Sequence, residues 1–140
     1  MKKILVFAGS NSLNSINKKF AVFAAGKLND VTLEIVDLNN FQLPTFGIDL
    51  ELSQGIPDNA MLFLEKIKSS QGIVLSLAEH NGSYTSVFKN LMDWMSRIDG
   101  KLWSNIPMLL LATSPGGRGG SSVMSAAKEV ASGTPRVMEE

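Results

Sequence analysis

Three largely apolar runs divide the chain, and each ends at a cluster of small or polar residues. They cover residues 4–8, 72–78 and 108–112. Runs of this length that are rich in Val, Ile, Leu and Phe predict strands buried on both faces. A further segment, residues 31–38, alternates apolar and polar positions, which is typical of a strand with one wetter face.

Helical periodicity appears between these strands. After a predicted N-cap at Ser15 and before a predicted stop at Asn29-Asp30, apolar residues recur at helical spacing at Ile16, Phe20, Phe23, Ala24 and Leu28. A second helix is predicted to begin at an Asp58 N-cap and to end near Ser69. Two more are predicted across residues 87–95 and 121–131. Residues 39–58 show little periodicity, so we expect a long loop packed against the domain.

Alternating strands and helices predict one α/β domain, residues 1–140, built on a doubly wound parallel sheet with right-handed crossovers. Residues 132–140 lack a Val/Ile/Leu-rich strand pattern, so we expect a sheet of four strands without the usual fifth. In such sheets, ligands bind at the carboxyl ends of the strands. The polar loops after the first, third and fourth strands all belong to that edge.

Composition narrows the classes of function. Hydrophobic residues make up 44% of the chain, and thirteen basic residues balance thirteen acidic ones. This balance argues against a nucleic-acid-binding or anionic-membrane surface, which needs clustered Lys and Arg. The absence of cysteine excludes disulfides, thiolate catalysis and Cys-ligated metals. The start lacks the pattern of a cleaved signal and no apolar stretch is long enough to cross a bilayer, so we expect a soluble cytoplasmic protein.

The first polar loop contains Ser10, Ser12 and Ser15 just before a predicted helix. Side-chain donors and the free N–H groups of a helix start suit a phosphate monoester. An ordinary polar turn with an N-cap explains the same residues equally well. The loop has neither the Gly-x-Gly-x-x-Gly spacing of dinucleotide loops nor the Gly-Lys-Ser/Thr of a P-loop.

The other two loops offer backbone rather than catalytic side chains. Residues 114–120 are rich in glycine, which lets backbone approach a flat ligand closely, although a flexible turn before a helix is the alternative. Residues 79–83 contain His80, the only histidine. A lone loop histidine is more often exposed than catalytic, and no clustered carboxylates accompany it, so neither a general acid–base pair nor a metal site is expected.

Taken together, the loop motifs resemble those of the NADPH-dependent FMN reductase family, the flavodoxin-like group that includes azoreductases, chromate reductases and small quinone reductases. The resemblance covers residues 2–131. It rests on Gly9-Ser10-x-x-x-x-Ser15-x-Asn17, on Glu79-His80-Asn81-Gly82-Ser83 followed by Lys89-Asn90-x-x-Asp93-Trp94, and on Ser114-Pro115-Gly116-Gly117-Arg118-Gly119-Gly120. It implies a flavodoxin-like fold of three α/β/α layers.

The resemblance also implies FMN as cofactor and NADPH, or NADH, as co-substrate. The FMN phosphate is expected on residues of the first loop: Ser10, Ser12, Ser15, Ile16 and Asn17. The isoalloxazine and ribityl chain are expected along Glu79, His80, Asn81 and Gly82, and the far edge of the flavin near Ser114, Gly116 and Gly117. Lys89, Asn90 and Asp93 are expected to brace this site rather than to act in catalysis.

Three departures from the family pattern bear on these expectations. Ser12 stands where many relatives have Arg, which removes one phosphate cation and predicts weaker FMN binding. His80 replaces the Tyr of a Pro-Glu-Tyr-Asn segment with a smaller, titratable ring. The fifth strand and last helix that usually complete the family fold are not evident.

The predicted function is an FMN-dependent oxidoreductase that passes electrons from NAD(P)H to a small-molecule acceptor: a quinone, an azo compound, a metal oxyanion or free flavin. The alternatives are a flavodoxin-type electron carrier, against which the zero net charge weighs, and a truncated fold with an incomplete flavin site. A homodimer or homotetramer is implied by the resemblance. Four apolar residues could form its interface or fill the domain core: Trp94, Ile98, Leu102 and Trp103.

Overall fold

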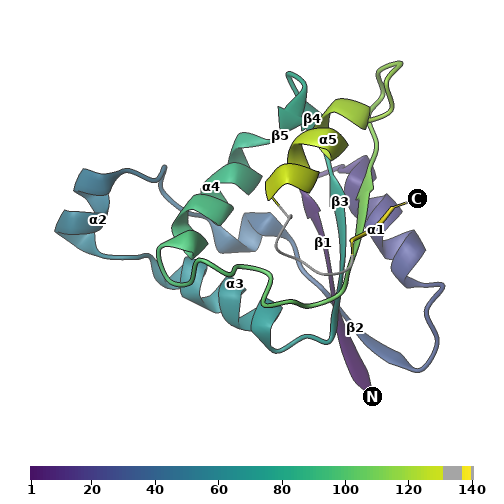
Figure 1. Ribbon diagram of the computed structural model, residues 1–140, viewed down its shortest axis with the longest axis horizontal. Coiled ribbons are helices and arrows are strands. Elements are labelled where there is room, and N and C mark those ends of the chain that lie inside the picture. Colours follow the sequence, from purple (N-terminus) through teal and green to yellow (C-terminus); the bar gives the residue numbers. More distant parts are fainter. Residues whose placement is uncertain (131–136, 140) are drawn as a thin grey trace.

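The computed structural model describes residues 1–130 and 137–139 and has a parallel sheet at its centre (Figure 1). The strand order is β2-β1-β3-β6-β7, the order of flavodoxin-like doubly wound folds. The strands are β1 (Lys2–Gly9), β2 (Val31–Ile35), β3 (Gly72–Leu77), β6 (Met108–Ala112) and β7 (Val137–Glu139). All four strands predicted from the sequence are therefore present, although β2 ends three residues early.

The prediction that a fifth strand is missing is wrong. Strand β7 pairs in parallel with β6, with Met108 opposite Val137 and Leu110 opposite Glu139. It escaped prediction because it has only three residues, Val-Met-Glu, which are too few to show a pattern. Ala131, the predicted end of the preceding helix, lies outside the described residues.

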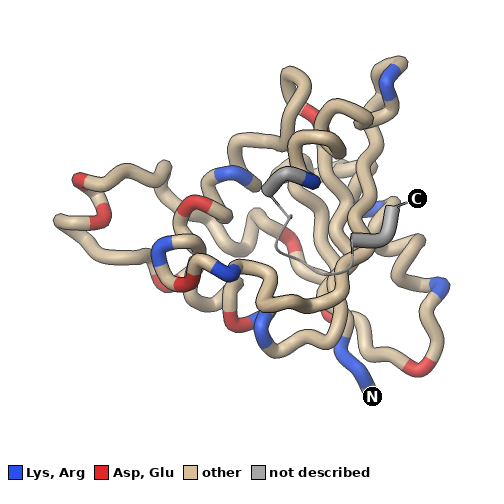
Figure 2. Tube along the Cα trace, in the orientation of Figure 1, with Lys and Arg blue, Asp and Glu red and all other residues tan. Residues whose placement is uncertain are grey.

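Helices cover both faces of the sheet and form the expected three layers. On one face lie α3 (Asp58–Lys68), α4 (Ser86–Ser96) and α5 (Ser121–Val130), and α1 (Ile16–Ala25) lies on the other (Figure 1). The larger apolar core fills the face with three helices. A smaller core, which includes Val6, Val74 and Leu111, lies beneath α1. Lys and Arg, and likewise Asp and Glu, are scattered over the described part of the trace (Figure 2).

Residues 39–58 do not form only the long packed loop that we predicted. They contain most of a short 3₁₀ helix (Leu38–Phe41) and a helix, α2 (Ile48–Gln54). Helix α2 has no buried residue, so it lacks the apolar stripe that would have revealed it. The next helix, α3, is capped by Pro57 without a side-chain hydrogen bond, and the predicted cap Asp58 is its first residue.

Helix α1 forms where predicted, but a different face of it is buried. Its buried residues are Asn17, Ala21 and Ala25, whereas the Phe23 side chain is 64% exposed. Small side chains at the contact let the helix backbone lie close to the flat sheet, which the larger apolar residues would prevent. The helix ends at a Gly26 C-cap, before the predicted stop at residues 29–30.

The apolar residues around the end of α4 fill the core of this domain. Trp94 is fully buried and Trp103 is 7% exposed, while Ile98 and Leu102 pack against the same core. The structure thus favours the core over the interface alternative. The Trp94 Nε1 and Asn90 Nδ2 groups both donate to the Pro44 carbonyl, at 2.7 and 3.0 Å. Asn90 therefore has a bracing role, as expected, but it holds the segment at Pro44 and not the predicted flavin site.

One polar side chain, Asn17, occupies the buried face of α1 and is only 2% exposed. Its Oδ1 accepts hydrogen bonds from Ser76 Oγ at 2.8 Å and from the Thr113 N–H at 3.1 Å. Its Nδ2 donates to the Thr113 carbonyl at 3.2 Å. Asn17 therefore fastens the first turn of α1 to the ends of β3 and β6.

Replacing Asn17 with alanine should lower the free energy of unfolding by about 1–3 kcal/mol, because the buried Ser76 and Thr113 groups lose their partner. Urea denaturation measures this change. The matched control is Asn14→Ala, at an exposed position of the same loop, which should change stability by less than about 0.5 kcal/mol. Equal stabilities of the two variants would contradict the fastening role of Asn17.

Candidate functional site

The loops that follow β1, β3 and β6 form one connected structure at the carboxyl edge of the sheet. The Asn17–Thr113 contacts join the first loop to the third. Thr85 Oγ1 donates to the Gly9 carbonyl at 2.8 Å, which joins the first loop to the segment after β3. Glu79 Oε1 accepts from the Val123 N–H at 2.9 Å, which joins that segment to α5. The loops predicted to form a site are thus held together in pairs.

The first loop places hydrogen-bond donors at the start of α1, where Ser15 is 7% exposed. Ser15 caps the helix, because its Oγ accepts from the Lys18 N–H at 3.1 Å. The hydroxyl proton of Ser15 remains a donor, and the N–H groups of Ile16 and Asn17 in the first turn have no helical acceptor. Together with the positive end of the helix dipole, these groups suit an anion.

The other predicted residues of this loop differ in their surroundings. Ser10 is half-buried, and its Oγ accepts from the Ser12 N–H at 3.1 Å. Ser12 is exposed, and Ile16 is 45% exposed. The Asn17 side chain is committed to Ser76 and Thr113, so only its backbone N–H is available to a ligand.

A bracing pair behind the first loop, Asp37 and Asn39, was not predicted from the sequence. Asn39 Nδ2 donates to the Asn11 carbonyl at 3.0 Å and to Asp37 Oδ1 at 3.0 Å. The pKa of Asp37 is lowered, chiefly by the hydrogen bond from the Asn39 backbone N–H and to a smaller extent by Lys18. The Asp-x-Asn sequence directly after β2 is a signal for this turn, because Asp side chains accept from the N–H two residues on.

The segment predicted as a polar loop at residues 79–83 is a hairpin. Strands β4 (Glu79–His80) and β5 (Ser83–Tyr84) pair in an antiparallel ladder. Asn81 and Gly82 make the turn with φ values of 52° and 78°, the positive angles of a type I′ turn. Asn-Gly is the strongest short-range hairpin signal, so the sequence did contain this information. His80 and both turn residues are exposed, and the β4–β5 hairpin directly follows β3 at the carboxyl edge of the sheet (Figure 1).

The glycine-rich loop, residues 114–120, contains one glycine that close packing requires and two that have free space around them. A Cβ at Gly120, which has a φ of 89°, would lie 3.0 Å from Ala112 Cβ, so this glycine permits close packing. A Cβ at Gly117 would meet no atom within 4 Å, and one at Gly116 would meet only Ser114 Oγ, at 3.6 Å. Ser114 Oγ accepts from the Gly116 N–H at 3.2 Å. Gly116 and Gly117 therefore present open backbone, which a flat ring can approach.

These features fit FMN, which has a phosphate at one end and a flat ring system at the other. The first loop offers anion donors, and the hairpin turn and the glycine-rich loop offer backbone without bulky side chains. Among the residues whose side chains the structure describes, no group of three or more His, Cys, Asp or Glu is placed to hold a metal ion.

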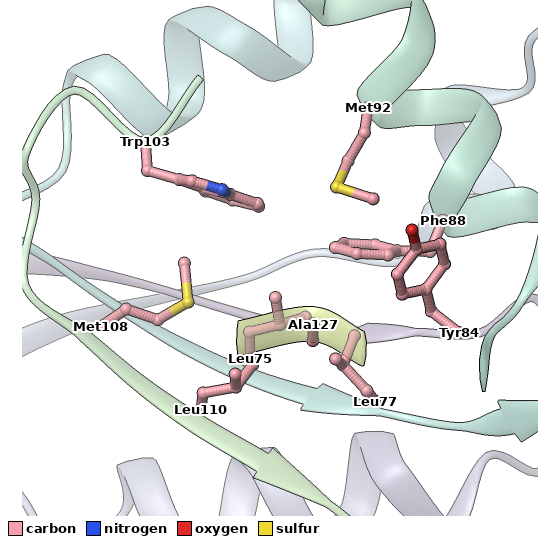
Figure 3. A pocket seen from close by; sticks show the side chains of 9 residues that line it. All are labelled: Leu75, Leu77, Tyr84, Phe88, Met92, Trp103, Met108, Leu110 and Ala127. Carbon is pink, nitrogen blue, oxygen red and sulfur yellow. The ribbon is translucent and has the colours of Figure 1, made fainter. Parts of the chain in front are cut away.

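A cavity inside the core does not belong to this site. It lies between the sheet, α4 and α5, and its lining is shown in Figure 3: Leu75, Leu77, Tyr84, Phe88, Met92, Trp103, Met108, Leu110 and Ala127. Its volume is about 10 Å³, the room of a single water molecule. We attribute it to imperfect packing between the two helices.

Comparison with known proteins identifies the family. The sequence profile of the NADPH-dependent FMN reductases matches residues 2–138. A 2-hydroxy-1,4-benzoquinone reductase from Burkholderia sp. is 32% identical over 119 residues, which cover 84% of this chain and 63% of that protein. A quinone reductase from Pseudomonas putida is 31% identical over 129 residues, which cover 90% and 67%. The chain thus spans less than two thirds of the Burkholderia protein.

Solved structures agree on the fold. The flavoenzyme NAD(P)H:(acceptor) oxidoreductase FerB of Paracoccus denitrificans superposes with a TM-score of 0.77 at 23% identity, covering 100% of this chain and 75% of FerB. An FMN-dependent NADH-azoreductase of Bacillus anthracis, solved in complex with FMN, superposes with a TM-score of 0.67 at 16% identity, covering 98% and 84%. The fold and the profile match both agree with the resemblance in the loop motifs, and the chain belongs to the NADPH-dependent FMN reductase family, whose members are oxidoreductases that use FMN with NAD(P)H.

Proposed function

We propose that this chain is an FMN-dependent NAD(P)H oxidoreductase whose flavin lies across the joined loops at the carboxyl edge of the sheet. The observation that carries the proposal is the linkage of all three loops through Asn17, Thr85 and Glu79. Unlinked loops would need to be ordered by the ligand, at a cost in affinity. Linked loops offer a phosphate site and a ring site at a fixed separation.

In this proposal the residues of the chain bind and orient the flavin. Ser10, Ser15 and the first N–H groups of α1 hold the phosphate, and the hairpin turn and Gly116-Gly117 border the ring. Bound FMN supplies the redox chemistry, because it can take a hydride from a reduced nicotinamide and release electrons to an acceptor. The protein therefore needs no acid–base pair of its own.

A quinone is the acceptor that the relatives support best. The Burkholderia and Pseudomonas putida relatives are both described as quinone reductases. Azo compounds, metal oxyanions and free flavin are further candidates from the family resemblance. A homodimer or homotetramer and a cytoplasmic location also stay predictions. No helix in the described part of the chain is both long and apolar enough to cross a bilayer.

Turnover by the FMN-loaded protein tests the proposal. We expect FMN-loaded protein to oxidise NADPH or NADH when 1,4-benzoquinone is added, followed as loss of nicotinamide absorbance. Protein that binds stoichiometric yellow flavin but gives no turnover with any quinone, azo or flavin acceptor would instead indicate an electron carrier. Folded, colourless protein that does not quench FMN fluorescence would indicate an incomplete flavin site.

Two substitutions at Ser15 test where the phosphate binds. Ser15→Ala should weaken FMN binding by about 1 kcal/mol or more, since a hydrogen bond to a charged group is lost. Ser15→Asp should weaken it further, because Asp keeps the helix cap but adds a negative charge beside the phosphate. Fluorescence titration measures affinity, and thermal unfolding checks that the Asp variant is folded. FMN affinity unchanged by Ser15→Asp would place the phosphate elsewhere.

A further inference from the structure

The first loop carries no positive charge of its own. Its residues from Ser10 to Asn17 are serine, asparagine, leucine and isoleucine. A phosphate monoester carries about −1.5 to −2 charge near pH 7. Neutral donors and the half charge of a helix end compensate only part of this. A cation from a neighbouring position would supply the missing positive charge of the phosphate site.

Lys18 is the first cation after the loop, and its ammonium group lies beside the loop. It is the third residue of α1, and helix side chains tilt toward the N-terminus of their helix. Its Nζ lies 3.4 Å from Asp37 Oδ2. Asp37 in turn contacts Asn39, whose Nδ2 donates to the Asn11 carbonyl in the loop. This chain of contacts places the Lys18 charge at the loop rather than along the helix.

The contact between Lys18 and Asp37 is loose. A distance of 3.4 Å is long for a charge-assisted hydrogen bond, which typically measures about 2.7–2.9 Å. The Lys18 side chain is 41% exposed. Asp37 has two better donors on its other oxygen, the Asn39 N–H at 2.9 Å and Asn39 Nδ2 at 3.0 Å. The Asp37 carboxylate therefore keeps both hydrogen bonds from Asn39 when the Lys18 ammonium moves away.

We propose that Lys18 is the phosphate cation of this flavin site. On binding, its ammonium turns from Asp37 toward the FMN phosphate, while Asp37 and Asn39 continue to hold the loop. The inference rests on the proposed function and deepens it. A cation at Lys18 also explains how the site could bind the phosphate with Ser12 at a position where the family resemblance implies an arginine.

The test compares FMN with riboflavin, which has the same ring system without the phosphate. Lys18→Gln should weaken FMN binding roughly tenfold, as expected for the loss of one hydrogen bond to a charged group. Riboflavin affinity should not change. The matched control is Lys19→Gln, at the adjacent exposed lysine, which should leave both affinities unchanged. Lys18→Arg, which keeps the charge, should retain FMN binding.

A rescue experiment separates a charge role from a structural one. Ser12→Arg in the Lys18→Gln background should restore FMN affinity, because it returns a cation to the loop. FMN affinity unaffected by Lys18→Gln would overturn the inference and leave the flavin site intact. Equal losses for FMN and riboflavin would also overturn it, because Lys18 would then act on the fold. Failure of the unmodified protein to bind FMN would instead overturn the proposed function.

Discussion

Hydrogen bonds to one buried side chain, Asn17, hold the functional edge of this protein together. An amide offers both a donor and an acceptor, so it satisfies the N–H and the carbonyl of Thr113 while also accepting from Ser76. Among the described residues, no buried side-chain nitrogen or oxygen lacks a hydrogen-bond partner. Because the hydrogen bonds of this buried network offset the cost of desolvating its polar groups, it can fix α1 against two strand ends.

The position of α1 in turn determines what the first loop can bind. The helix lies close to the sheet because its contact face is Asn17, Ala21 and Ala25. Its first turn therefore points free N–H groups into the space at the strand ends, next to Ser15. The hairpin packs against α5, which directly follows the glycine-rich loop, and neither segment contributes an acid–base pair. The edge is suited to holding a cofactor that brings its own chemistry.

Strands marked by long apolar runs, and the helix cap at Ser15, were the most predictable features. Patterns that extend over several residues predicted the first four strands of the sheet and their parallel direction. They also predicted the N-cap at Ser15. Strand β7 and helix α2 are short or lack a buried face, so no periodicity marked them. The buried face of α1 was predicted wrongly because its alanines are there for their small size, which lets the helix lie close to the sheet, and not for their hydrophobicity. The family resemblance placed Asn17 at the phosphate, but it could not show that the side chain turns inward to Ser76 and Thr113, which leaves only the backbone N–H for a ligand.

An NMR titration with FMN shows whether the three separate loops form one flavin site. FMN is added to ¹⁵N-labelled protein while amide signals are followed at Ile16, Asn17, Gly82, Gly116 and Gly117. We expect a single site, at which the amides of all three loops shift along one saturation curve with a single dissociation constant. Shifts confined to one loop, or centred on a surface away from the carboxyl edge of the sheet, would contradict it.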